Sequence, residues 1–269
     1  MSTKILEVKN LTKRFGDLTA VNSISFEVER GEVFGVVGPN GAGKTTTIKI
    51  LTTLLPPTSG EALIGGYNVT KNASKVRRII GYVPQLLSAD GNLTGYENLL
   101  IFAKLYDIPS KERKAKIKDS LHFMGLSSSA DKMVKSYSGG MIRRLEIAQS
   151  VLHNPMVLFL DEPTVGLDPG ARDSVWEYVK TLAGNGTTVI MTTHYMEEAD
   201  AMCSRVAIMN KGNIAAIGSP KELKTSIGDD GASLNKVFEY YIGKDLDSDV
   251  SEGNFKDVSR TRRVTRRLG

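Results

Sequence analysis

The feature that most constrains the fold is the run Gly-Pro-Asn-Gly-Ala-Gly-Lys-Thr at residues 38–45, which directly follows the apolar residues 33–37. A continuous apolar run of this length is typical of a strand that is buried on both faces of a sheet. After the glycine-rich run, residues 45–55 have a helical pattern, and Pro56 and Pro57 follow. The succession of buried strand, glycine-rich turn and helix predicts one repeating unit of an α/β fold.

The glycine-rich run matches the pattern G-x-x-x-x-G-K-[ST], which binds phosphate groups. Its glycines let successive backbone N–H groups turn toward an anion, and the following helix presents its positive end to the same charge. Lys44 can reach the β- and γ-phosphates of a nucleotide, and the Thr45 hydroxyl can ligate Mg²⁺. A merely flexible glycine loop would leave both residues unexplained, so we interpret residues 38–45 as a phosphate-binding loop.

A second candidate for nucleotide chemistry is the apolar run 157–160, which is followed directly by Asp161 and Glu162. A buried strand that ends in a carboxylate places Asp161 at the carboxyl edge of the sheet, where ligands bind in open α/β folds. We expect Asp161 to hold Mg²⁺ through water and Glu162 to orient and deprotonate an attacking water molecule. Strands often end in solvated acids, so this pattern gains its meaning from the phosphate-binding loop.

The other candidate strands extend the α/β pattern. Residues 4–9 and 21–29 alternate apolar and polar side chains, which predicts an antiparallel sheet at one side. Buried runs recur at 188–191 and 206–209. Because these strands alternate with helical segments, the sequence indicates a largely parallel sheet in the core.

One stretch of the chain looks helical throughout, with helix candidates at 93–105, 110–124 and 141–152. We expect residues 86–155 to form a helical insert between two core strands, with Arg143 and Arg144 on a solvated helix face. After residue 218 the chain becomes polar, with one amphipathic helix candidate at 234–242. Beyond residue 245 acids and then arginines dominate, so a packed core is not expected there.

Composition excludes several kinds of protein. The 269 residues are 41% apolar and 24% charged, and no apolar run approaches the roughly 20 residues that span a bilayer. Cys203 stands alone, and neither it nor His122 and His153 is assigned a role. The N-terminus lacks the apolar block of a signal peptide, so we expect a soluble intracellular protein.

The net charge of +5 belongs to the C-terminal tail. Between residues 256 and 269 one acid, Asp257, accompanies six basic residues, which are Lys256, Arg260, Arg262, Arg263, Arg266 and Arg267. The rest of the chain is therefore neutral, and a nucleic-acid-binding body is not supported by its charge.

The order of the remaining motifs carries a family resemblance. Tyr137, Ser138, Gly139, Gly140 and Met141 stand between the two nucleotide motifs. Downstream come the runs Gly-Leu-Asp at 166–168 and Thr-Thr-His at 192–194. Over residues 5–218 this series resembles the ATP-binding subunit of ATP-binding cassette (ABC) transporters. The family's commonest signature is Leu-Ser-Gly-Gly-Gln, from which the chain departs at its flanking residues.

The resemblance implies a P-loop NTPase (RecA-like) core with an antiparallel β subdomain and an inserted α-helical subdomain. The ABC ATPase domain would then occupy residues 1–218, with its core at 1–85 and 156–218 and its helical subdomain at 86–155. Residues 219–269 would form a C-terminal extension. That polar extension resembles the ATP-binding subunits of two-component exporters of the drug-resistance (daunorubicin/doxorubicin) type.

Site residues for ATP and Mg²⁺ follow from the same resemblance. Phe15 matches the aromatic residue that stacks on adenine. Gly38, Pro39, Asn40, Gly41, Ala42, Gly43, Lys44, Thr45 and Thr46 match the residues that wrap the triphosphate. Gln85 matches the glutamine that senses Mg²⁺ and the attacking water and links ATP to the membrane partner. His194 matches the histidine that contacts the γ-phosphate. The implied catalytic residues are Glu162, His194, Gln85 and Lys44, and the implied metal ligands are Thr45, Gln85 and Asp161.

The remaining matched residues imply partners. Ser138, Gly139 and Gly140 match the signature that contacts the γ-phosphate bound to the opposing subunit, and Asp168 matches the loop that links the two sites. The expected assembly is a head-to-tail dimer with a second copy or a homologous ATPase subunit. Separate transmembrane permease subunits would hold it, as a cytoplasmic peripheral protein, at the inner face of the membrane.

Two other functions are weighed against transport. A soluble ABC-type ATPase that acts on DNA or ribosomes usually carries long coiled-coil or zinc-bearing insertions, or two cassettes in tandem, and none is visible here. A P-loop kinase leaves Ser138, Gly139, Gly140 and His194 unexplained. The sequence gives no indication of the transported substrate.

The Arg-rich tail generates a first test. Its two interpretations are a disordered solvated segment and a segment attracted to anionic lipid headgroups, where each basic residue contributes about 1 kcal/mol. The lipid interpretation predicts that deleting residues 256–269 abolishes cosedimentation of the chain with anionic vesicles. Vesicle binding that persists after the deletion would contradict it.

Overall fold

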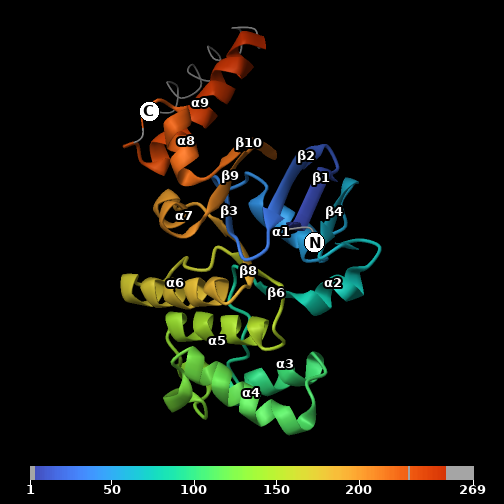
Figure 1. Ribbon diagram of the computed structural model, residues 1–269, viewed down its shortest axis with the longest axis vertical. Coiled ribbons are helices and arrows are strands. Elements are labelled where there is room, and N and C mark those ends of the chain that lie inside the picture. The colour runs from blue at the N-terminus through green and yellow to red at the C-terminus, as the bar shows by residue number, and fades with distance from the viewer. Residues whose placement is uncertain (1–3, 230, 253–269) are drawn as a thin grey trace, which may run out of the picture.

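The computed structural model describes the backbone of residues 4–229 and 231–252, with side chains up to residue 243. Within this part the chain forms two β-sheets and the helices that cover them (Figure 1). The Arg-rich segment 256–269, expected from the sequence to be a disordered tail, lies outside the described residues.

The larger sheet has six strands in the order β10-β9-β3-β8-β7-β6. Its strands are β3 (Val33–Val37), β6 (Ile80–Val83), β7 (Val157–Asp161), β8 (Thr188–Thr193), β9 (Arg205–Asn210) and β10 (Asn213–Gly218). All neighbouring pairs are parallel except the pair of β9 and β10 at one edge. Val37 is in register with Thr193, and Asp161 with Thr192. The carboxyl ends of β3, β8 and β7 therefore meet at one edge.

The smaller sheet is antiparallel, with the order β2-β1-β4-β5. Its strands are β1 (Lys4–Phe15), β2 (Leu18–Glu29), β4 (Ser59–Ile64) and β5 (Tyr67–Asn68). The first two strands are longer than the alternating pattern predicts, because their pairing continues through register shifts up to Phe15 and Leu18. Gly16, with φ 57°, lies in the tight turn that joins them.

Side chains pack on both faces of the six-stranded sheet. On one face, Phe34 and Val36 join a core cluster with the smaller sheet and with α1 (Lys44–Leu51). On the other face, Val37 joins a second cluster with the helices α5 (Gly139–Val151), α6 (Pro169–Gly184) and α7 (Met196–Met202). Burial on both faces explains the uninterrupted apolar run that the sequence shows.

A helical block follows β6 and ends before β7. It contains α3 (Gly95–Leu105), α4 (Ser110–Phe123), α5 and the 3-10 turns η1 (Ser127–Ser129) and η2 (Val134–Ser136). Capping residues determine where α3 and α5 begin, and both helices begin at other residues than the sequence pattern predicts. Thr94 and Glu97 form a capping box, so α3 begins two residues later than predicted. Ser138 accepts from the Met141 amide, so α5 begins two residues earlier.

The helix after the glycine-rich loop is shorter than predicted. It ends at Leu51 rather than residue 55, before the two prolines are reached. Thr53 adopts a left-handed conformation with φ 65°, and the amides of Leu54 and Leu55 both donate to the carbonyl of Lys49. Such hydrogen bonds satisfy the last carbonyls of a helix and terminate it.

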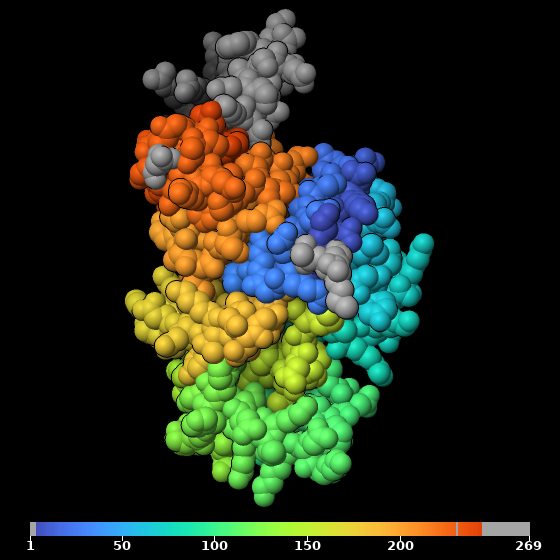
Figure 2. All heavy atoms as spheres, in the orientation of Figure 1, coloured from blue at the N-terminus to red at the C-terminus, as the bar shows by residue number. Residues whose placement is uncertain are grey.

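The short helix α2 (Ala73–Ile79) precedes β6, and the chain ends in α8 (Pro220–Ser226) and α9 (Leu234–Glu252). The last helix runs ten residues beyond the predicted end at 242. Its buried residues Leu234 and Val237 belong to the core cluster that contains α7. The helical block and this C-terminal pair lie at opposite ends of the molecule (Figures 1 and 2). In the described part of the chain, no helix is long and apolar enough to cross a membrane.

Close packing of β6 against α5 generates a prediction. A β-carbon on Gly81 would overlap the backbone carbonyl of Ser150, so we expect Gly81→Ala to lower the free energy of unfolding by about 1–3 kcal/mol. Gly184 has no atom within 4 Å of such a carbon, and as a control Gly184→Ala should change stability by less than about 1 kcal/mol. Urea unfolding measures both. Equal stability of the two variants would contradict the packing argument.

Candidate functional site

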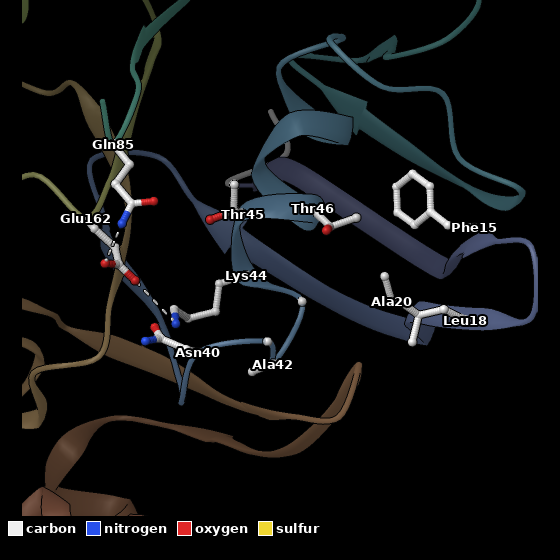
Figure 3. Close-up of a pocket in the computed structure, with 12 residues that line it drawn as sticks. Phe15, Leu18, Ala20, Asn40, Ala42, Lys44, Thr45, Thr46, Gln85 and Glu162 are labelled. Carbon is white, nitrogen blue, oxygen red and sulfur yellow. Dashed lines mark hydrogen bonds and ion pairs between the residues drawn. The ribbon is translucent and has the colours of Figure 1, made fainter. Parts of the chain in front are cut away.

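A cavity of about 510 Å³ lies beside the carboxyl edge of the parallel strands. It is lined by Phe15, Leu18, Ala20, Asn40, Gly41, Ala42, Gly43, Lys44, Thr45, Thr46, Gln85 and Glu162. Phe15 and Leu18, from the β1–β2 turn, stand at the opposite end from Gln85 and Glu162 (Figure 3). The structure therefore brings most of the predicted nucleotide residues around one space.

The backbone of the glycine-rich loop requires glycine at its last turn. Gly43 is the N-cap of α1 and has φ 102°, a left-handed conformation that other residues adopt at a cost. A β-carbon at Gly43 would also overlap the carbonyl oxygen of Ala20 on β2. The loop is therefore wedged between α1 and the smaller sheet, and the N-terminal end of α1 begins at the cavity. This is the arrangement that favours an anion.

The ammonium group of Lys44 is buried under the loop. Its Nζ donates to the carbonyl oxygens of Gly38, at 2.8 Å, and Pro39, at 3.0 Å. The same Nζ lies 3.4 Å from Oε1 of Glu162, and only 4% of the lysine surface is exposed. The loop carbonyls and the carboxylate together compensate the buried charge. Gly38 and Pro39 thus serve the site through their carbonyls and do not line the cavity.

The carboxylate of Glu162 is where residues from distant parts of the chain meet. Nε2 of Gln85 donates to its Oε2 at 3.2 Å. Nδ1 of His194 lies 3.2 Å from the same oxygen, and Lys44 lies near Oε1. Three residues that the sequence assigns separately to catalysis thus surround a fourth. Glu162 is itself 5% exposed.

The backbone of Glu162 is strained. Its φ is 48°, and its amide donates to Oγ1 of Thr192 at 3.0 Å. A glutamate in this conformation costs of order 1 kcal/mol, and such residues persist where the surroundings hold them. The sharp turn separates the partners of two adjacent carboxylates, since Asp161 contacts Thr45 and Thr192 instead.

Two threonine hydroxyl groups contact the carboxylate of Asp161. Its Oδ1 accepts from Oγ1 of Thr45, at 3.2 Å, and from Oγ1 of Thr192, at 2.6 Å. Burial raises the pKa of Asp161 above its usual value, and the two hydroxyl donors partly oppose that rise. A hydroxyl and a carboxylate are the hard oxygen ligands that Mg²⁺ prefers. Among the described residues no group of three or more His, Cys, Asp or Glu side chains could hold a metal ion.

The other predicted residues lie outside the cavity. Ser138 caps α5 and is exposed, and Asp168 is exposed and caps α6 by accepting from the Ala171 amide at 2.9 Å. A β-carbon at Gly140 would lie 2.6 Å from that of Ala171, so the starts of α5 and α6 are in close contact. Ser138, Gly139, Gly140 and Asp168 thus belong to a second surface, formed where these two helices begin.

Sequence reasoning missed several residues of the site. Leu18 and Ala20 line the cavity because the β1–β2 hairpin brings them beside Phe15, a long-range consequence of strand pairing. Thr192 supports both acidic residues, and its place before His194 at the end of β8 could have suggested this role.

The interpretation of Arg143 as part of a solvated face is wrong. Arg143 is 2% exposed and pairs with Glu146 at 3.0 Å. Arg144 is partly buried, and its Nη1 donates to the carbonyl of Met124 at 3.1 Å. The pattern could not reveal this because α5 lies between the sheet and the helical block and contacts both.

Known proteins resemble the chain over most of its length. The family model described as ABC transporter matches residues 21–165. The linearmycin resistance ATP-binding protein of Bacillus subtilis (strain 168) is 41% identical over 226 residues, which are 84% of this chain and 73% of the relative. The daunorubicin/doxorubicin resistance ATP-binding protein of Streptomyces peucetius is 44% identical, with coverage of 84% and 68%. The Nod factor export ATP-binding protein I of Ralstonia nicotianae is 42% identical, with coverage of 83% and 70%.

Solved structures support the same grouping. An ATP binding subunit of an ABC transporter superposes with a TM-score of 0.81 at 28% identity, over 88% of this chain and 99% of that one. The ADP conformation of an ATP-binding cassette superposes with a TM-score of 0.75 at 27% identity, over 90% of this chain and all of that one. The fold class expected from the sequence is thereby confirmed.

The buried ammonium generates a prediction about binding. Lys44→Ala should weaken binding of a fluorescent ATP analogue about tenfold to a hundredfold, because a charge-assisted hydrogen bond contributes about 1.5–3 kcal/mol. Lys49 is exposed on the same helix, so Lys49→Ala is the matched control and should leave affinity unchanged. Unchanged affinity in Lys44→Ala would count against the proposed contact with phosphate.

Proposed function

Because the chain belongs to the ABC transporter family as an ATP-binding subunit and ATPase, we propose that it powers export by hydrolysing ATP in a head-to-tail dimer attached to separate membrane subunits. The observation that carries this proposal is the convergence of Lys44, Gln85 and His194 on the carboxylate of Glu162. A base held beside a phosphate-binding loop and two polar side chains suits the attack of water on a γ-phosphate.

In the proposed reaction Glu162 acts as general base. The triphosphate occupies the loop, with the ammonium of Lys44 beside its β- and γ-phosphates. Glu162 then accepts a proton from water as the water oxygen bonds to γ-phosphorus and the bond to the β–γ bridging oxygen breaks. ADP and phosphate result, and the proton is held by Glu162. Gln85 orients the water, and His194 contacts the γ-phosphate.

Magnesium fits the residues beside this base. Thr45 and Asp161 offer the oxygen ligands, with Gln85 near the same edge, and Mg²⁺ would neutralise charge on the β- and γ-phosphates. A cation there also compensates Asp161, whose buried carboxylate is costly to ionise. Phe15, which is 48% exposed at the other end of the cavity and has the Lys13 ammonium 5.1 Å from its ring centroid, would stack on the adenine ring.

The proposed dimer follows from the second surface. Ser138, Gly139 and Gly140 form the N-terminal end of α5, which favours an anion, yet they do not line the chain's own cavity. A second subunit in head-to-tail orientation would present this surface to the γ-phosphate held by the first. Asp168, at the start of α6, would then lie at the boundary between the two sites.

A groove beside β6 suits a contact with a membrane subunit. The large apolar side chains that are exposed include Leu54, Leu86, Leu87, Ile101 and Leu105. Leu54 and Leu105 line a groove of about 500 Å³ together with Phe102 and Tyr106. Large exposed apolar side chains that share a groove mark a contact with another protein. We assign this groove to the permease, which would hold the subunit at the inner face of the membrane.

The three relatives differ in what their names associate with them, which are linearmycin, daunorubicin or doxorubicin, and Nod factor. All three match this chain at 41–44% identity over similar spans. Similar ATP-binding proteins therefore carry the names of unrelated compounds, and we assign cargo selection to the membrane subunits.

A single substitution tests the proposed role of the base. Glu162→Gln should retain ATP affinity and lower ATP hydrolysis by a factor of about 10²–10⁴, the usual contribution of a general base. Because ATP then persists, size-exclusion chromatography with Mg²⁺ and ATP should detect a stable dimer. Glu177 is exposed on α6, so Glu177→Gln is the matched control and should hydrolyse ATP normally. Normal turnover in Glu162→Gln would refute the assignment.

A further inference from the structure

A buried ion pair on α5 lies outside the machinery described so far. Arg143 and Glu146 are one turn apart on this helix, 3.0 Å from one another, and are 2% and 3% exposed. Burial lowers the pKa of Arg143, and the carboxylate of Glu146 opposes that effect. Two buried charges are expensive, and apolar residues of similar volume often stabilise a protein as well or better. The pair therefore calls for an explanation other than stability.

Both members of the pair hold the same loop. Arg143 donates from Nη1 to the carbonyl of Pro84, at 2.7 Å, and from Nη2 to the carbonyl of Gln85, at 2.8 Å. Oε1 of Glu146 accepts from the amides of Ser88 and Ala89 and from the Ser88 hydroxyl. The pair thus holds the loop 84–89 by two carbonyls at its start and two amides at its end.

The geometry of these bonds is specific to the two side chains. A guanidinium group presents its donors in a rigid planar fork, which can bridge two successive carbonyls and an adjacent carboxylate together. A carboxylate accepts several donors at once, so Glu146 can receive both loop amides while it pairs with Arg143. A lysine at position 143 would keep the charge and lose the fork.

The loop held in this way carries Gln85, whose side chain reaches Glu162 at 3.2 Å. We propose that Arg143 and Glu146 form a positioning clamp that fixes the loop 84–89 on α5 and thereby keeps Gln85 aligned with Glu162. This inference concerns the same site as the proposed ATP hydrolysis and rests on that proposed function. Neither Arg143 nor Glu146 lines the cavity, so both act through Gln85.

The clamp also connects the two proposed surfaces. Arg143 follows Ser138 by five residues, or about 7.5 Å along a helix. A displacement of α5 when its N-terminal end engages the partner's nucleotide would therefore move the loop of Gln85 with it. Binding of nucleotide in the partner's site would in this way align Gln85 with Glu162 in the first subunit.

The decisive variant removes the clamp and leaves no buried charge. Arg143→Met combined with Glu146→Leu keeps the volume, and we expect the double variant to fold with an unfolding midpoint close to that of the parent. Hydrogen exchange on the full chain should nevertheless become faster in peptides that cover residues 86–90, because the amides of Ser88 and Ala89 lose their acceptor. Unchanged exchange there would overturn the proposal, and this measurement does not depend on turnover.

Kinetics separate positioning from a general loss of structure. The double variant should hydrolyse ATP with kcat reduced roughly tenfold to a hundredfold and KM for ATP within about twofold, because the phosphate-binding loop is untouched. Adding Gln85→Ala should cause little further loss, since both changes remove the same aligned side chain. If the loss of kcat caused by Gln85→Ala and the loss caused by the double variant multiplied when combined, the proposal would be overturned.

Arg144 supplies the matched control, since it is the next residue and contacts Met124 instead of the loop. Arg144→Met should leave kcat and the exchange of residues 86–90 unchanged, and an equal loss of kcat would overturn the proposal. Arg143→Lys keeps the buried charge and should lose much of the same activity, whereas full activity would overturn the role of the fork. Failure of the proposed function is recognised separately, by normal turnover of Glu162→Gln, while hydrogen exchange still decides on the clamp.

Discussion

The contact between the Lys44 ammonium and the Glu162 carboxylate is the interaction on which the site depends. The two residues follow β3 and β7, which are separated in the sheet by β8. Their approach needs parallel strands whose carboxyl ends coincide, which the register of Val37, Thr193, Asp161 and Thr192 provides. It also needs the left-handed turn at Glu162, which the hydrogen bond from the Glu162 amide to Oγ1 of Thr192 holds. The order of the strands is therefore a requirement of the chemistry.

Much of this arrangement can be predicted from the sequence because the residues involved are close together in the chain. The buried strand, the glycine-rich loop and Lys44 are contiguous, and so are the strand and the acidic pair that ends it. Strand burial, loop geometry and the direction of a helix act over a few residues. Many predicted helix boundaries differ from the observed ones by one to four residues. These differences arise from capping residues and from reversals of the chain, as at Thr94, Ser138 and Thr53.

What the sequence could not provide is contact between distant segments. Arg143 and Arg144 are adjacent and chemically alike, yet one is buried against the loop of Gln85 and the other contacts Met124. No periodicity distinguishes two neighbours on a helix that is covered from two sides. The support that Thr192 gives to both acids, and the place of Leu18 in the cavity, likewise exist only once the strands have paired.

The position of Lys44 has a consequence for the shape of the loop that it ends. Its ammonium donates to the carbonyls of Gly38 and Pro39, which begin the same loop, so the side chain closes the loop into a ring. Residue 44 therefore contributes to the backbone conformation of the loop as well as to its charge.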